Sequence, residues 1–341
     1  MARAREDGAA VVGEAAGDLF SIPATISPEA QAFLRTAFGR SQRDGRRWPD
    51  PADRAAWRAV WEEREAERQP LVDDALAQFK PVVDETTLAG VPPFDLRPRT
   101  WRNDGSLLVY LHGGAYVVCS ACSTLNVAAA MAEATGTRVV SIDYPLAPAG
   151  RWRQVSDEIC RAVSALAEAG TPLGRMAIWG DSADGALAAA TALRLRNEGR
   201  GLPAALLLWS PWSDIAPIGD SYATLAAEEP LYVYEQVLAR AALAYAEPDD
   251  WTHPYVSPVY GDFSLGFAPT LIQAGTKETF LSNAVRLYRA LDLAGVPATL
   301  DVWEGMWHVF QSELALPEAM QARRKAAAFL RRWLDRKAAP R

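Results

Sequence analysis

Histidine and cysteine are both scarce in this chain of 341 residues, which has three of each. A low, odd cysteine count argues against a disulfide framework and favours a reducing compartment. Cys119 and Cys122 form a Cys-x-x-Cys pair, but no second pair and no nearby histidine cluster could complete a zinc site. We therefore predict no metal, and a reaction that needs an imidazole has only His112, His253 or His308 to use.

Positive charge and long apolar runs are also lacking. The formal net charge is −7 and the basic residues are scattered, so we predict no nucleic-acid partner. No apolar run is long enough to span a bilayer, so we predict no membrane insertion. Residues 1–17 are small, polar and charged and lack the apolar segment of a signal peptide, so we expect a cytoplasmic protein.

The chain does contain many apolar residues, arranged as alternating strands and helices. Half of its residues are hydrophobic, which is enough for one large α/β domain. The pattern predicts an antiparallel pair of strands at 81–87 and 94–99, then strands at 107–111, 138–143, 176–179, 204–209, 269–274 and 298–303. Helices are predicted at 127–134, 155–169, 186–196, 282–294 and 317–336. Such alternation predicts a mainly parallel, doubly wound sheet, which binds ligands at the carboxyl ends of its strands.

Two helical stretches lie outside this alternation. Near the N-terminus, a helix is predicted to open at Ser27, and one long helix or two short ones are predicted at 52–79. About sixty residues separate the strands at 204–209 and 269–274, and a helix is predicted within them at 231–246. Because this interval is too long for a simple connection, we interpret it as an insertion over the sheet.

A serine lies at the predicted junction of a strand and a helix. The apolar run Met176 to Trp179 ends in Gly180-Asp181-Ser182, and an alanine-rich helical run follows. A sharp turn of this kind exposes the Ser182 hydroxyl and points the following backbone N–H groups toward incoming negative charge. The pattern favours attack on a carbonyl carbon, and a serine that only caps a helix is the alternative.

A serine nucleophile needs a base, and only one histidine is well placed. His112 lies in a glycine turn and His253 in a polar loop, whereas His308 follows a predicted strand after the serine. Glu278 follows the penultimate strand and is predicted to hold the tautomer of His308. Asp301 is the second candidate for that carboxylate, but it lies inside a strand rather than beyond its end.

Backbone donors for a developing oxyanion are predicted in the turn His112-Gly113-Gly114. Glycine N–H groups have no side chain beside them, so a substrate can approach them closely. The N–H of Ala183, which follows the serine, is the third predicted donor. A tight loop without a catalytic role is the alternative for the glycine turn.

Together these segments resemble the bacterial members of the hormone-sensitive-lipase family of α/β-hydrolase esterases. The resemblance spans about residue 80 to 312 in the family's order and rests on five segments: His112-Gly113-Gly114-Ala115-Tyr116, Asp143-Tyr144-Pro145-Leu146-Ala147-Pro148, Gly180-Asp181-Ser182-Ala183, Ser210-Pro211-Trp212-Ser213-Asp214 and Gly305-Met306-Trp307-His308-Val309-Phe310. It implies the α/β-hydrolase fold, with an eight-stranded, mostly parallel sheet flanked by helices and covered by a helical cap. It also implies ester hydrolysis through an acyl-enzyme without a cofactor, and a homodimer, which no residue pattern indicates.

Carried over residue by residue, the resemblance makes Ser182 the nucleophile, His308 the base and Glu278 the acid, where the family more often has Asp. The oxyanion donors then fall on the following residues: Gly113, Gly114 and Ala183. The implied domain organisation is an N-terminal segment with cap helices at 1–80, a catalytic domain in two parts at 81–210 and 266–341, and a cap insertion at 211–265.

The chain departs from the family pattern at Asp184, and more mildly at Ala115. The elbow pattern asks for glycine two residues after the serine, because the helix packs closely on the strands there. Asp184 adds a Cβ and a charge at that contact. We expect it to lower esterase activity without changing the fold, and a non-catalytic or impaired ligand-binding relative is the rival interpretation.

The sequence therefore predicts a serine esterase acting on small-molecule esters with short- to medium-chain acyl groups. Amidase and lactonase activities stay open, because they use the same triad chemistry. Trp212 is a candidate for the acyl pocket, with core packing as the alternative.

Overall fold

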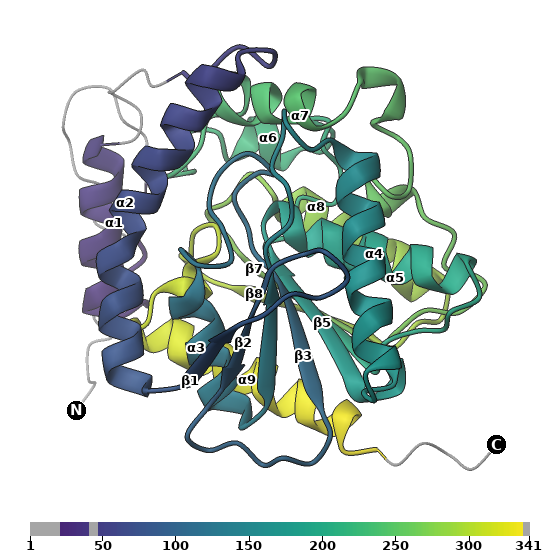
Figure 1. The fold of residues 1–341 in the computed structure, drawn as a ribbon. Helices are drawn as coiled ribbons and strands as arrows, with labels where there is room; N and C mark the ends of the chain where they lie inside the picture. The colour runs from purple at the N-terminus through teal and green to yellow at the C-terminus, as the bar shows by residue number, and fades with distance from the viewer. Residues whose placement is uncertain (1–20, 41–46, 337–341) are drawn as a thin grey trace, which may run out of the picture.

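An eight-stranded sheet organises the fold (Figure 1). The computed structural model describes residues 21–40 and 47–336. The strands lie in the order β1-β2-β4-β3-β5-β6-β7-β8; β2 is antiparallel to both of its neighbours, and the other neighbouring pairs are parallel. Their bounds are Val82–Glu85, Pro93–Arg97, Leu107–Leu111, Arg138–Ile142, Met176–Asp181, Ala205–Trp209, Thr270–Gly275 and Ala298–Trp303, from β1 to β8. The predicted α/β-hydrolase sheet is therefore confirmed, with all eight strands near their predicted positions.

The central strands are apolar because helices cover both faces of the sheet. Every residue of β3, β6 and β7 is buried, as parallel strands between two layers require. Along β3, Leu107, Val109 and Leu111 pack into one core cluster, while Leu108 and Tyr110 pack into another. This alternation follows from the two-residue period of a strand.

The helices form one layer on each face. On one face, α3 (Leu125–Thr135) packs beside α9 (Pro317–Leu334), and on the other lie α4 (Trp152–Glu168), α5 (Ala183–Asn197) and α8 (Leu281–Leu293). Each buries an apolar face against the sheet. The layers hold the sheet rigid and leave the carboxyl ends of its parallel strands free to carry a site.

The remaining helices come from the two segments outside the alternation. Both α1 (Pro28–Arg40) and α2 (Arg54–Phe79) are single helices, so the region 52–79 forms one long helix, with Pro70 inside it. The segment after β6 contains α6 (Ser221–Thr224) and α7 (Ala239–Tyr245). These four helices lie around one side and one end of the sheet in Figure 1.

One expectation about these segments is wrong in part, and part of another lies outside the described residues. The helix predicted at 231–246 begins only at Tyr234, and its first turn, Tyr234–Leu238, is π-helical, so its predicted start is wrong. Residues 1–20 of the predicted N-terminal segment lie outside the described residues. The division into cap and catalytic parts stays a prediction.

Helix α5 approaches β5 closely at Gly180. A Cβ atom at this position would lie 2.1 Å from the carbonyl oxygen of Asp184, a backbone atom in the first turn of the helix. Only glycine fits such an approach. The first residue of the Gly-Asp-Ser motif is thus required by packing.

Gly180→Ala should therefore destabilise the fold strongly. Overpacking costs about 1–3 kcal/mol in a well-packed core, and a collision between backbone atoms costs at least the upper end of that range. Gly174→Ala is the matched control, because nothing lies within 4 Å of a Cβ there. Urea unfolding measures both variants, and equal unfolding free energies would contradict the packing argument.

Candidate active site

Ser182 lies at the junction of β5 and α5, in a backbone conformation that side-chain-bearing residues rarely adopt. Its φ is +58° and its ψ is −126°. Hydrogen bonds hold the turn: the Ser182 N–H donates to the carbonyl of Trp209 at 2.8 Å, and the Ser182 carbonyl accepts from the N–H of Trp212 at 2.8 Å. The sharp turn predicted at this serine is present.

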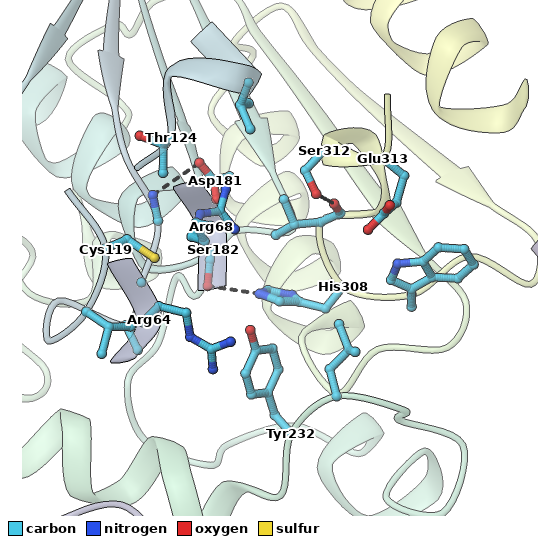
Figure 2. Close-up of a pocket in the computed structure, with 18 of the residues that line it drawn as sticks. Arg64, Arg68, Cys119, Thr124, Asp181, Ser182, Tyr232, His308, Ser312 and Glu313 are labelled. Carbon is cyan, nitrogen blue, oxygen red and sulfur yellow. Dashed lines mark hydrogen bonds between the residues drawn. The ribbon is translucent and has the colours of Figure 1, made fainter. Parts of the chain in front are cut away.

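Two later loops bring His308 and Glu278 to the serine. The Nε2 atom of His308 lies 2.9 Å from Ser182 Oγ (Figure 2), and its Nδ1 atom lies 2.8 Å from Glu278 Oε2. Glu278 lies between β7 and α8, and His308 follows β8. The structure thus brings together the three residues that the sequence proposed for nucleophile, acid and base.

The Glu278 carboxylate is fully buried and well supplied with donors. Its Oε1 atom accepts from the Gly275 N–H at 2.7 Å and from Ser210 Oγ at 3.0 Å. Ser210 Oγ also accepts from the N–H of Val309, at 3.0 Å. Sequence reasoning did not give Ser210 this bridging position, although it opens one of the segments that carry the resemblance.

The alternative carboxylate, Asp301, lies elsewhere. Its Oδ2 atom accepts from the side chains of Gln273 and Trp303, each at 2.9 Å, and its Oδ1 atom pairs with Lys325. It belongs to the middle of β8. The structure gives it no contact with His308.

The other two histidines lie away from the serine. His112 is fully buried, stacks on the Tyr144 ring at 4.6 Å, and has its pKa lowered by burial. His253 packs near Trp152, with 4.7 Å between ring centroids. The choice of His308 by elimination agrees with this geometry.

The glycine turn lies beside the serine, but one of its N–H groups is already engaged. The Gly113 N–H donates to Asp181 Oδ1 at 3.1 Å, which corrects the prediction that Gly113 is an oxyanion donor. No acceptor for the N–H of Gly114 or Ala115 lies among the described residues. Gly114 has a φ of +138°, and a Cβ there would lie 2.0 Å from the Val118 carbonyl oxygen, so only glycine fits.

The serine and histidine open onto a cavity of ≈ 290 Å³. Its walls come from the glycine turn, from α2 and from the segments near residues 231–238 and 307–313. Besides Ser182 and His308, its lining includes aromatic and charged side chains: Phe33, Trp48, Tyr232, Trp307, Arg64, Arg68 and Glu313. Figure 2 shows Arg64 and Tyr232 close to the Ser182–His308 pair.

Sequence reasoning missed the residues that α2 contributes to this cavity. Arg68 donates through Nε to the Ser123 carbonyl at 2.8 Å. The sequence predicts helical structure at 52–79 but does not show which of its charged residues reach a cavity. Long-range packing of α2 against the sheet decides it.

Trp212 does not line the cavity, which corrects its predicted place in the acyl pocket. It is fully buried in the main core cluster. Its ring stacks between Tyr116, at 6.1 Å, and Phe280, at 5.5 Å. The alternative interpretation, core packing, holds.

Asp184 is fully buried in the first turn of α5, and its carboxyl group contacts Tyr144. Its Oδ2 atom lies 2.8 Å from the Tyr144 hydroxyl, and its Oδ1 atom has no hydrogen-bond partner among the described residues. Gly180 and Gly185 make the close approaches at this turn.

Burial of Asp184 also opposes a charge on its carboxyl group. Burial raises the pKa of Asp184 well above its usual range, the nearby Asp181 raises it further, and the hydrogen bond from Tyr144 acts in the opposite direction. A helix N-terminus favours an anion by at most about 2 kcal/mol, whereas burying an unpaired ion costs several kcal/mol. Desolvation outweighs the effect of the helix N-terminus, so the burial of Asp184 favours its neutral form.

A second buried carboxyl group, Glu229, contacts the turn that carries Glu278. It accepts from the N–H of Leu231 at 2.9 Å and from the N–H of Thr279, next to Glu278, at 3.1 Å. Burial, reinforced by Glu278 and opposed by His308, raises the pKa of Glu229 to about 7. The segment after β6 is thereby attached to the turn that carries Glu278.

No described helix has both the length and the apolar character needed to cross a membrane. Within residues 21–40 and 47–336, no group of three or more His, Cys, Asp or Glu side chains is arranged to hold a metal ion.

Comparisons with known proteins agree with this fold. Residues 108–312 match a family model described as the alpha/beta hydrolase fold. The chain is 37% identical over 252 residues to an acetyl-hydrolase of Streptomyces hygroscopicus, with 71% of this chain and 84% of that protein covered. It is 31% identical to an esterase of Acinetobacter venetianus, with 74% and 81% covered.

Solved structures give the same result. The esterase E25 superposes with a TM-score of 0.86 at 26% identity, covering 96% of this chain and all of that one (100%). An esterase from the bacterial hormone-sensitive lipase family superposes with a TM-score of 0.77 at 32% identity, covering 90% and 99%. The fold and its site thus define an α/β hydrolase. Within that class, the chain belongs to the bacterial hormone-sensitive-lipase family of esterases.

The pKa of Glu229 predicts a loss of stability as the pH rises. Because its folded-state pKa of about 7 lies above its ordinary value of 4.5, the unfolded chain releases this proton first. The free energy of unfolding should fall by about 3 kcal/mol between pH 4.5 and pH 7 through this group. Glu229→Gln stays neutral and should lack that part of the pH dependence. Urea unfolding at pH 5 and pH 8 compares the two proteins, and parallel pH profiles would contradict the assignment.

Proposed function

We propose that the chain hydrolyses carboxylic esters through an acyl-enzyme on Ser182. The observation that carries this proposal is the unbroken chain of contacts from Ser182 Oγ through His308 to Glu278, at 2.9 and 2.8 Å, beside a cavity. His308 takes the serine proton as the hydroxyl attacks the ester carbonyl, and Glu278 stabilises the imidazolium. The proton then passes to the leaving alcohol, and water enters through the same base to release the acid.

The oxyanion of each tetrahedral intermediate needs donors beside Ser182. The N–H groups of Gly114 and Ala115 are free for this role among the described residues, and the N–H of Ala183 opens helix α5. Such donors act on charge that develops only in the transition state, so they lower the barrier rather than tighten substrate binding. Gly113 supports the loop through Asp181 instead.

Short- to medium-chain acyl esters suit the cavity best. Its volume of ≈ 290 Å³ lies at the small end of ligand pockets, which span about 300–1,000 Å³. An acetyl-hydrolase and an ethyl acetate hydrolase are among the relatives, which favours a small acyl group. A cytoplasmic location and a homodimer stay predictions.

A non-catalytic, ligand-binding relative is the second candidate, motivated by Asp184 at the elbow. The intact Ser182–His308 contact favours the enzyme, as does the burial of Asp184, which favours its neutral form. A fluorophosphonate probe separates the two, since a receptor without an activated serine would not be labelled at Ser182.

Ser182→Ala should reduce the hydrolysis of p-nitrophenyl esters by at least about 10⁴-fold, because the acyl-enzyme can no longer form. A series from acetate to decanoate should give the highest kcat/KM at or below hexanoate. Ser264→Ala, on an exposed loop, is the matched control and should be unchanged. Turnover that survives in Ser182→Ala would rule out the serine mechanism, and a folded native protein that neither turns over nor reacts with the probe would support the ligand-binding relative.

Glu278→Gln should lower kcat on the order of 10⁴-fold, because the amide no longer stabilises the imidazolium. Asp301→Asn replaces the other candidate carboxylate and should leave kcat within twofold, since Asp301 makes no contact with His308. Steady-state kinetics with p-nitrophenyl acetate measure both. The reverse order of effects would transfer the role of the acid to Asp301.

A further inference from the structure

The Tyr144 hydroxyl lies between two acceptors, at 2.8 Å from Asp184 Oδ2 and 3.1 Å from the carbonyl oxygen of His112. A tyrosine hydroxyl carries one proton and can donate to only one of them. An ionised Asp184 would take that proton, and the His112 carbonyl would receive nothing from Tyr144. A neutral Asp184 instead donates a hydrogen bond to the Tyr144 oxygen, and the Tyr144 hydroxyl then donates to the carbonyl oxygen of His112. Only the neutral acid makes both contacts hydrogen bonds.

The surroundings of Asp184 favour the neutral form. Its carboxyl group is fully buried, and its Oδ1 atom has no partner among the described residues. The described titratable groups that interact with it come from five different segments and include no cation: Tyr110, Tyr116, Tyr144, Asp181 and Tyr245. A buried carbonyl oxygen without a partner costs less free energy than a buried carboxylate without a counter-charge.

The His112 carbonyl belongs to the peptide unit that leads into the glycine turn. That unit carries the His112 carbonyl on one side and the Gly113 N–H on the other, and the Gly113 N–H donates to Asp181 Oδ1 at 3.1 Å. The Tyr144 ring also stacks on the His112 ring, at 4.6 Å and 10°. One rigid peptide plane is therefore held from both sides, by Asp181 and by Asp184 through Tyr144.

The two aspartates flank the nucleophile closely in sequence, so the plane is tied to the turn that carries Ser182. A peptide unit is planar, so fixing its oxygen and its N–H fixes its orientation. That orientation sets the direction in which the chain leaves Gly113, and with it the aim of the next two N–H groups, those of Gly114 and Ala115. Oxyanion donors act only when they point at the position that the oxyanion will occupy.

We propose that Asp184 is a positioning residue that acts as a neutral acid and, through Tyr144, orients the His112–Gly113 peptide so that the oxyanion donors face the ester carbonyl. The inference rests on the proposed hydrolysis by Ser182. It reverses the expectation, drawn from the sequence, that Asp184 lowers activity.

Five variants test this with p-nitrophenyl butyrate at pH 7.5, and one of them, Asp184→Gly, removes the carboxyl group as Asp184→Ala does. Asp184→Asn keeps an N–H that can donate to the Tyr144 hydroxyl, so its kcat should stay within threefold of the native value. Asp184→Ala and Tyr144→Phe each break the chain of hydrogen bonds and should lower kcat at least tenfold while KM changes less than threefold. Tyr245→Phe is the matched control, because its buried hydroxyl has no hydrogen-bond partner among the described residues, and it should be unchanged.

A pH profile provides the second readout. As the pH rises and Asp184 ionises, the Tyr144 hydroxyl donates to Asp184 instead of to the His112 carbonyl. The kcat of the native protein should therefore fall at alkaline pH. Asp184→Asn cannot ionise and should keep its kcat there. If Asp184 had only a structural role, its replacement would change the stability of the protein but would not produce this difference between the pH profiles of native and Asp184→Asn kcat.

Several results would overturn the proposal: Asp184→Asn as impaired as Asp184→Ala, identical alkaline profiles, or a rise in kcat for Asp184→Gly. Thermal melting and fluorophosphonate labelling of Ser182 verify that each variant is folded. If Asp184→Ala does not fold, the kcat of Tyr144→Phe tests the proposal in its place. Failure of the proposed function looks different, because the native protein would then be inactive or Ser182→Ala would keep its turnover.

Discussion

The strained turn at Ser182 is the constraint on which the rest of the structure depends. A residue with a side chain at φ +58° and ψ −126° costs about 1–3 kcal/mol and persists only where its surroundings over-determine it. Here the carbonyl of Trp209, the N–H of Trp212 and the close approach of α5 at Gly180 hold it. The strand before it and the helix after it are both fully packed, so the strain cannot relax. The hydroxyl stays at the edge of the sheet, where two other loops arrive.

The parallel sheet explains why side chains far apart in sequence meet there. Ser182, Glu278 and His308 follow β5, β7 and β8, whose carboxyl ends lie at one edge. This arrangement takes polar groups out of water, and hydrogen bonds offset part of that cost. Ser210 bridges Glu278 to the chain after His308. Burial of Asp184, without a cation nearby, favours its protonated form.

The segments outside the sheet do more than cover this edge. Helix α2 supplies Arg64 and Arg68 to the cavity, and the segment after β6 supplies Tyr232. The same segment contacts the turn that carries Glu278, since Glu229 accepts a hydrogen bond from the N–H of Thr279 and Glu228 forms an ion pair with Lys277. The segment that lines part of the cavity is therefore also hydrogen-bonded and ion-paired to the turn that carries Glu278.

The eight strands, the helices α3, α4, α5, α8 and α9 that cover the sheet, and the order Ser182, Glu278, His308 were predictable from the sequence, because each of these features depends on a local residue pattern. A buried parallel strand is a continuous apolar run, a strand-to-helix turn has its own residues, and chain order follows from both. Only the tertiary structure decided four other features: the partner of the Gly113 N–H, the core position of Trp212, the inward face of α2 and the contact of the Asp184 side chain with Tyr144. Each of these features depends on which groups from distant parts of the sequence folding brings into contact. Burial of those groups then determines whether they are charged, hydrogen-bonded or packed against apolar side chains.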